Sequence, residues 1–197
     1  MLFVNLSLDK IIIIWWWKKI ILEKRNLERT LPNTLKDIFG KNFYSKIFIV
    51  NWPGSFTSIR VWTLCINMLN FLYKNQIEIF NISKIDLYSL FVKQNLLPSK
   101  WLLYIWQTKN YWNFDFQSQS YDQVSASDIW LKNKWDLFLD QTFEDIDDRI
   151  NIDFDWQTLL LNFRNKTNKV DIKNMWISPS NHVQPIYIIQ PNITTKQ

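Results

Sequence analysis

The chain has 197 residues, of which 47% are apolar, and a formal net charge of +5. This apolar content is enough for a buried core and excludes wholesale disorder. With one cysteine, Cys65, and one histidine, His182, the chain cannot form an internal disulfide, a cysteine-rich zinc site or a paired-histidine metal site. The apolar run at residues 11–17 is bracketed by lysines and is far shorter than the roughly 18 residues of a membrane span. We therefore expect a soluble, cytoplasmic protein with no membrane contact.

Apolar periodicity in the first half of the chain predicts strands that alternate with helices. Thr30 is expected to cap the first helix, with Pro32 in its first turn and Gly40 as its stop signal. The expected elements are, in chain order, a strand at 2–8, a hairpin at 10–14 and 18–22, a helix at 31–39, a buried strand at 46–51, a helix at 58–74, a strand at 76–81 and a helix at 82–93.

From residue 100 the pattern changes. Strands are expected at 102–105 and 111–116, and helical patterns follow at 126–140 and 155–165. An acidic stretch at residues 144–148 separates the two helical patterns. The whole order predicts an α/β protein with two subdomains, residues 1–98 and 99–197.

The tryptophans stand where glycines are expected. The chain has 2 glycines and 12 tryptophans, whereas the usual glycine content of about 7% would give roughly 14 glycines in a chain of this length. Trp15, Trp16 and Trp17 fall between two apolar strands, where a tight turn needs a positive φ and hence glycine. One hypothesis is that many of these residues are glycines encoded by UGA codons; the other is a tryptophan-rich chain with an aromatic stacking surface.

The most informative stretch is residues 49–62, which read IVNWPGSFTSIRVW. It resembles the signature GPGSFTG[LI]R[IV]G of the TsaB family, with matches at 53–57 and 59–61. The departures are Trp52, Ser58 and Trp62, all at family glycines. The family loop therefore corresponds here to Trp52, Pro53, Gly54, Ser55, Phe56, Thr57, Ser58 and Arg60.

The resemblance implies an actin-like, ribonuclease-H-like ATPase fold, with a complete first subdomain and a smaller, divergent second one. It also implies a non-catalytic subunit that pairs with the catalytic paralogue TsaD in threonylcarbamoylation of the tRNA adenosine beside the anticodon. An ATPase subunit, TsaE, would join the complex, tRNA would be reached only through the complex, and a homodimer of the isolated chain is an open possibility. No cofactor, metal or catalytic residue is expected.

The residues themselves also argue against catalysis. Asn5 and Leu6 stand toward the end of the first strand, where nucleotide-binding members of this fold place an aspartate and small or hydroxyl residues. Residues 53–57 open a helix and could bind an anion, but Ser55 or Thr57 as a helix cap explains them equally. The carboxylates at 144–148 could form a metal or acid–base cluster, although a charge run of this kind is usually a solvated loop.

The helix at 58–74 carries polar residues at Thr63, Asn67, Asn70 and Lys74, on one narrow stripe. The remaining circumference is apolar and must be covered on two sides, either by the core or by a partner. From the resemblance we expect an interface with the catalytic paralogue at Leu31, Leu35, Ile38, Ile59, Ile66 and Leu69.

Three functions compete at this stage. The first is the non-catalytic pairing subunit, and the second is a small actin-fold ATPase or peptidase-like enzyme. The third is a stand-alone RNA-binding protein, for which the basic residues are Lys18, Lys19, Lys24, Arg25, Arg29, Lys132, Lys134, Arg164, Lys166 and Lys169.

Overall fold

The chain folds into two compact units. The computed structural model describes residues 1–7, 10–16, 18–23, 25–41, 44–51, 56–105, 110–118, 120–124, 151–155, 158–163, 166–175 and 177–184. The first unit combines residues 1–83 with the segment that begins at Ser178, and the second spans residues 84–177. The first unit is therefore discontinuous in sequence. The predicted subdomain boundary at residues 98 and 99 stays a prediction.

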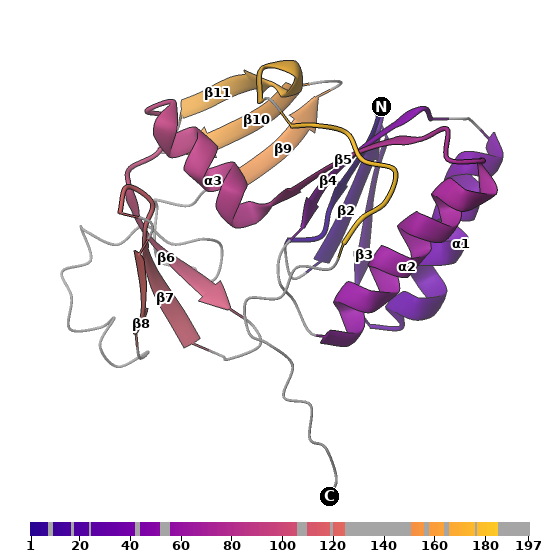
Figure 1. Ribbon diagram of the computed structural model, residues 1–197, viewed down its shortest axis with the longest axis horizontal. Helices are drawn as coiled ribbons and strands as arrows, with labels where there is room; N and C mark the ends of the chain where they lie inside the picture. The colour runs from indigo at the N-terminus through magenta and orange to yellow at the C-terminus, as the bar shows by residue number, and fades with distance from the viewer. Residues whose placement is uncertain are drawn as a thin grey trace, which may run out of the picture. The chain divides into compact units, whose positions relative to one another are not determined.

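A five-stranded mixed sheet, in the order β3-β2-β1-β4-β5, is the centre of the first unit (Figure 1). β1, β4 and β5 are parallel, whereas β2 and β3 continue from β1 as antiparallel neighbours. Parallel neighbours need a crossover, and helices supply it between β3 and β4 and between β4 and β5. The strands are β1 (Leu2–Asn5), β2 (Lys10–Trp15), β3 (Lys18–Glu23), β4 (Lys46–Asn51) and β5 (Glu78–Ser83). The predicted mixed α/β fold class is confirmed.

Helices α1 (Leu27–Lys41) and α2 (Phe56–Leu72) pack together against one face of this sheet (Figure 1). The strand register places Leu2, Val4, Ile47 and Ile49 on that face, all at most 1% exposed. The core cluster joins them to Leu27, Leu31, Leu35, Ile38 and Phe39 of α1 and to Trp62, Ile66 and Leu69 of α2. The core of the first unit therefore lies between the sheet and the two helices.

Both predicted boundaries of α1 were wrong. The helix begins at Leu27, four residues before the expected start, so Thr30 lies inside its first turn. The Thr30 hydroxyl donates to the Asn26 carbonyl oxygen at 3.1 Å and so does not act as a cap. Gly40 is still helical and the helix ends at Lys41. The apolar side of the helix was predicted correctly because it depends on spacing and not on the terminal residues.

The polar stripe of α2 binds a segment more than a hundred residues away. We call residues 178–184 the return strap, because there the chain comes back to the first unit. Ser180 and Ile79 exchange two backbone hydrogen bonds, of 2.9 and 3.1 Å, so the strap pairs with the edge strand β5. The side chains of Asn67 and Asn70 both hydrogen-bond to the strap backbone. The stripe therefore faces protein.

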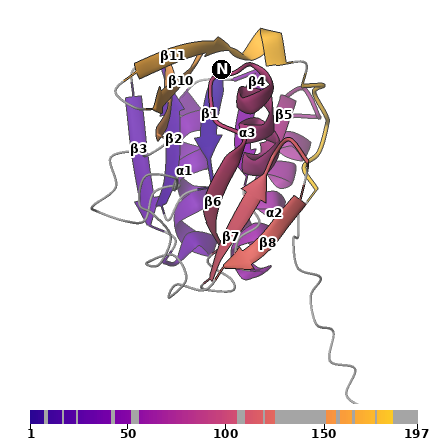
Figure 2. The same ribbon diagram turned by 90° about the vertical axis from the view of Figure 1, so that its left-hand side faces the viewer.

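The described part of the second unit contains one α-helix and two three-stranded sheets. α3 (Lys84–Lys93) carries Tyr88, which lies edge-on to Phe116 with 6.4 Å between ring centroids. Figure 2 shows β6, β7 and β8 side by side, as their pairing requires. The strands are β6 (Lys100–Ile105), β7 (Asn110–Asp115), β8 (Ser120–Val124), β9 (Asn151–Asp155), β10 (Thr158–Phe163) and β11 (Lys166–Asp171), and a 3-10 turn (Ile172–Met175) follows β11.

The predicted helix at 155–165 was wrong, because residues 158–163 form the central strand of an antiparallel sheet. Leu159 and Leu161 are fully buried and Leu160 is only partly so, which is the two-residue period of a strand. The helical pattern at 126–140 lies outside the described residues. None of the described helices is long and apolar enough to cross a membrane.

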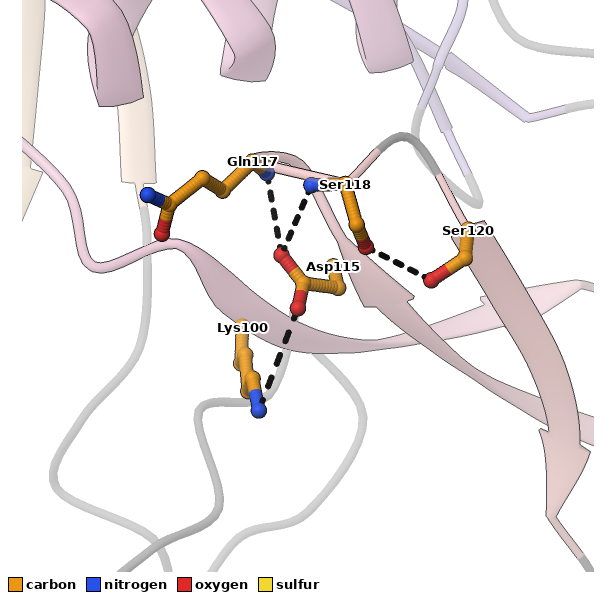
Figure 3. Close-up of polar contacts among 5 residues, drawn as sticks. All are labelled: Lys100, Asp115, Gln117, Ser118 and Ser120. Carbon is orange, nitrogen blue, oxygen red and sulfur yellow. Dashed lines mark hydrogen bonds and ion pairs between the residues drawn. The ribbon is translucent and has the colours of Figure 1, made fainter.

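The turn after β7 is organised by one carboxylate (Figure 3). Asp115 Oδ1 accepts hydrogen bonds from the backbone N–H groups of Gln117, at 2.9 Å, and Ser118, at 3.3 Å. Lys100 Nζ lies 3.8 Å from Asp115 Oδ2. The backbone hydrogen bonds, more than Lys100, lower the pKa of the Asp115 carboxyl below its usual value.

A depressed pKa has a definite sign in the pH dependence of stability. The Asp115 carboxylate should stabilise the fold fully above the unfolded-state pKa of about 3.9, and this contribution should disappear as the pH falls through the lower folded-state pKa. NMR titration of the Asp115 side chain should give a pKa below that of an unstructured aspartate. Asp115→Ala should remove this part of the acid-side loss of stability, and titration of Asp115 at an ordinary pKa would contradict the argument.

Candidate partner-binding surface

The family loop lies at the start of α2. Residues 52–55 are outside the described residues, and Phe56, Thr57 and Ser58 form the first turn of the helix. Arg60 is exposed on the next turn. The helix thus begins within the motif, as both the anion-binding and the helix-cap interpretations require. The choice between those two interpretations stays open.

Neutral polar side chains gather where the parallel strands end. Asn5 Oδ1 accepts hydrogen bonds from the Ser7 backbone N–H, at 3.0 Å, and from the Ser7 hydroxyl, at 2.7 Å. Asn51 Nδ2 donates to Asn81 Oδ1 at 2.5 Å. Ligands of α/β proteins commonly bind at this edge of the sheet. The described side chains at the ends of β1 and β4 are uncharged, whereas Lys84, which directly follows β5, is 3% exposed.

A groove runs between α1 and α2 on the side away from the sheet. Its volume is about 550 Å³. The α1 wall is formed by Glu28, Pro32, Leu35, Lys36, Phe39 and Gly40, and the other wall by Val61, Leu64, Cys65, Met68, Leu69, Leu72 and Tyr73. The lining is apolar except for a few charged residues at its border, which is typical of a site that binds another apolar surface.

The α2 side of this groove exposes large apolar side chains. Leu64 is 60% exposed, Met68 55%, Phe71 74% and Leu72 71%. These residues recur at helical spacing, so they form a ridge along α2; we call this ridge together with the groove the α1–α2 surface. Exposed apolar side chains that gather in this way, unlike scattered ones, mark interaction sites.

Five of the six predicted interface residues are buried. Leu31, Leu35, Ile38, Ile66 and Leu69 are between 1% and 8% exposed and belong to the core cluster. The side chain of Ile59 is outside the described residues. Leu35 and Leu69 also reach the floor of the groove. Contact through the other buried side chains would require the core to open, so the apolar residues available to a partner are the ridge residues.

The reason for this difference is the return strap. A helix that is apolar around most of its circumference and carries one polar stripe suggests that the stripe faces water and that the apolar sides are covered. In the structure the stripe is covered by the strap, and a neighbouring side of α2, with Leu64 and Met68, is exposed. The asparagines in the stripe were the signal in the sequence that could have indicated a covered stripe, because one asparagine amide can both donate to a backbone carbonyl and accept from a backbone N–H.

Cys65 and His182 lie in different surroundings. Cys65 lies half-buried in the groove wall, and burial raises the pKa of its thiol, against a smaller lowering by a backbone hydrogen bond. A raised pKa disfavours the nucleophilic thiolate. His182 is exposed on the strap, where its ring lies 3.4 Å from the Gln184 amide. The structure therefore favours Cys65 as a half-buried apolar residue.

Other predicted sites can be placed only in part. The acidic stretch at 144–148 lies outside the described residues, as do Lys24, Lys132, Lys134 and Arg164. Lys18 and Lys19 on β3, and Arg25 and Arg29 near the start of α1, are exposed in the first unit. Lys166 and Lys169 are exposed on β11 in the second unit. RNA binding by these residues stays a prediction.

Comparison with solved structures gives a weak likeness of fold. The chain is similar to YeaZ from Pseudomonas aeruginosa, with a TM-score of 0.37 and 13% identity over 64% of each chain. It is equally similar, with a TM-score of 0.37 and 14% identity, to an uncharacterized protein from Pseudomonas aeruginosa described as similar to the peptidase YeaZ; that match covers 64% of this chain and 63% of the other. The matches thus span less than two thirds of either solved chain. No family profile and no curated protein matches the sequence.

The raised pKa of Cys65 predicts slow alkylation. Iodoacetamide at pH 8 should modify the folded chain several-fold more slowly than the same chain in urea, because less of the thiol is ionised and part of it is shielded. Mass spectrometry follows the reaction directly, since Cys65 is the chain's single cysteine. Faster alkylation of the folded chain would instead indicate an activated thiol and would favour the enzyme interpretation.

Proposed function

We propose that this protein is a non-catalytic pairing subunit of the TsaB type, which binds a TsaD-like transferase through the α1–α2 surface. In this role it supports threonylcarbamoylation of the tRNA adenosine beside the anticodon and holds no cofactor of its own. The observation that carries the proposal is the groove between α1 and α2 with its exposed ridge at Leu64, Met68, Phe71 and Leu72.

The shape and chemistry of this surface suit a helical partner. Two neighbouring helices with an apolar furrow between them can accept one or two helices of another protein and complete a helix bundle. Glu28 and Lys36 at the border of the groove are placed to orient such a partner without adding charge at the centre. Four large apolar side chains, each more than half exposed, gain most from being covered in this way.

The sequence motif identifies the partner class in this proposal. Residues 53–57 and 59–61 match the family signature, and the signature leads into α2, which carries the ridge. The mixed sheet β3-β2-β1-β4-β5, with its helical crossovers, agrees with the α/β class that the resemblance implies. A TsaE-like ATPase and tRNA join through the complex, and without the transferase the same surface is available to a second copy of the chain.

An ATPase or peptidase-like enzyme is the second candidate. It has less support, because the described residues at the carboxyl ends of β1 and β4 are neutral amides and hydroxyls that bond to one another or to neighbouring strands. Phosphate transfer and peptide hydrolysis both need charged or metal-bound groups near the reacting atoms.

The pairing proposal is tested with one charged substitution and a matched control. Leu64→Glu places a carboxylate in the ridge, and we expect the Kd for the co-expressed TsaD-like protein of the same genome to rise at least about 30-fold. Ile21→Glu is the control, because Ile21 is also an exposed apolar residue, 55% against 60%, but lies on β3. Binding is measured by isothermal titration, with gel filtration to establish the stoichiometry.

Exposed positions tolerate such changes, so both variants should keep their thermal unfolding midpoints within a few degrees of the parent. Equal weakening by both substitutions would point to a general effect of charge. Undiminished pairing of the Leu64→Glu variant, or no pairing of the parent chain, would refute the proposed surface or the proposed function respectively.

A further inference from the structure

The return strap is bonded to α2 through the side chain of Asn67, which makes the same pair of hydrogen bonds that a neighbouring strand would make. Asn67 Nδ2 donates to the Val183 carbonyl oxygen at 3.0 Å, and the Val183 N–H donates to Asn67 Oδ1 at 2.8 Å. This is the two-way exchange that paired strands make through their backbones. Val183 is 2% exposed and belongs to the core cluster, so its backbone groups depend on Asn67 for hydrogen bonds that water can hardly replace.

Asn70 makes a second link one turn further along. Its Nδ2 donates to the Asn181 carbonyl oxygen at 2.7 Å, and its Oδ1 accepts from the Ile77 N–H at 3.0 Å. Asn70 is 1% exposed. Since Ile77 leads into β5 and Ser180 pairs with β5, these bonds tie α2, the edge strand and the strap into one network.

The same helix carries the ridge on another side. Met68 follows Asn67 directly, and Leu64 precedes it by three residues, about one turn. A helix moves as a rigid element, so a change in its tilt or rotation at Asn67 moves Leu64 and Met68 as well. We propose that the return strap positions α2 for pairing, so that loosening the strap weakens partner binding without touching the partner; this rests on the proposed function.

The test separates positioning from stability. Asn67→Ala removes both bonds to Val183, and we expect the Kd for the TsaD-like protein to rise about two- to thirty-fold. Binding is measured well below the unfolding transition, where all of the chain is folded, so loss of stability alone would not change the Kd. Amide hydrogen exchange in α2 should become faster at the same time.

Two further variants complete the experiment. Asn67→Asp keeps the acceptor for the Val183 N–H but sets a carboxylate oxygen against the Val183 carbonyl oxygen, so it should weaken pairing as well; it also serves if the alanine variant does not fold. Asn33→Ala, at an exposed position of α1, is the control and should leave the Kd unchanged. An unchanged Kd in the Asn67 variants overturns the positioning role, whether or not exchange becomes faster. If Leu64→Glu also pairs normally, the proposed surface has failed; if the parent chain does not pair at all, the proposed function itself has failed.

The turn between β2 and β3 supports a separate inference. Trp15 pairs with Lys18, so Trp16 is the first residue of the connection between the two strands. Trp16 has a φ of 55°, in the left-handed region that bulky side chains disfavour. Three of the other four described residues with positive φ are asparagines, the side chain that tolerates this region best after glycine, and the fourth is Lys74 at the end of α2. Two-residue hairpin turns require this conformation and favour glycine there.

Composition points in the same direction, with 2 glycines against 12 tryptophans. A UGA codon differs by one base from the tryptophan codon UGG and by one base from the glycine codon GGA. We infer that residue 16 is glycine in the protein as its own cell makes it, because its codon is UGA and is read there as glycine.

The decisive measurement is the tryptic peptide of residues 11–18 from protein isolated from its source cells, sequenced by mass spectrometry. We expect glycine at position 16, and tryptophan there, or a UGG codon in the gene, overturns the inference. In recombinant protein, Trp16→Gly should raise the unfolding midpoint by a few degrees. Trp16→Ala is the matched control and should gain less, because alanine retains the Cβ that disfavours a φ of 55°.

Discussion

The first unit depends on the contacts that shield the sides of helix α2 from water. This helix has three sides in use: one is buried against the sheet with Trp62 and Ile66, one is bonded to the return strap, and one is exposed beside the groove. A helix without charged residues in most of its length is not soluble by itself, so each side needs a neighbour. The strap and the sheet supply two of the three.

The exposed side of α2 is the feature that supports the proposed binding role. Reactive sites in α/β proteins are built from charged groups on the loops after parallel strands. In the described part of this chain the ends of β1 and β4 hold amides and a hydroxyl, as in the bond between Asn51 and Asn81, and Asn5 Nδ2 and Asn51 Oδ1 are buried with no hydrogen-bond partner. The surface that is left unsatisfied is apolar, and it lies on the helices.

Local patterns of apolar residues predicted a helix or strand well where the segment fitted only one type of element. The apolar residues 47–50 are all fully buried in β4, as a continuous run in a central parallel strand requires. The pattern failed at residues 159–161, where three consecutive leucines hide the two-residue period that burial reveals. It also failed to indicate which side of α2 is exposed, because spacing shows that residues share a side but not what covers that side. The contacts of Asn67 and Asn70 with residues 181 and 183 are non-local, and no window of sequence contains both partners.

The discontinuity of the first unit has a consequence during synthesis. Roughly 95 residues separate Ser83 from Ser178, and at about 5–20 residues per second a ribosome needs roughly 5 to 20 seconds to make them. Throughout that interval the sheet and both helices can already assemble, yet the outer edge of β5 and the amides of Asn67 and Asn70 lack their partner. Unpaired strand edges recruit other chains. The nascent protein therefore passes through a window in which it is most prone to aggregate, and the window closes when the strap emerges.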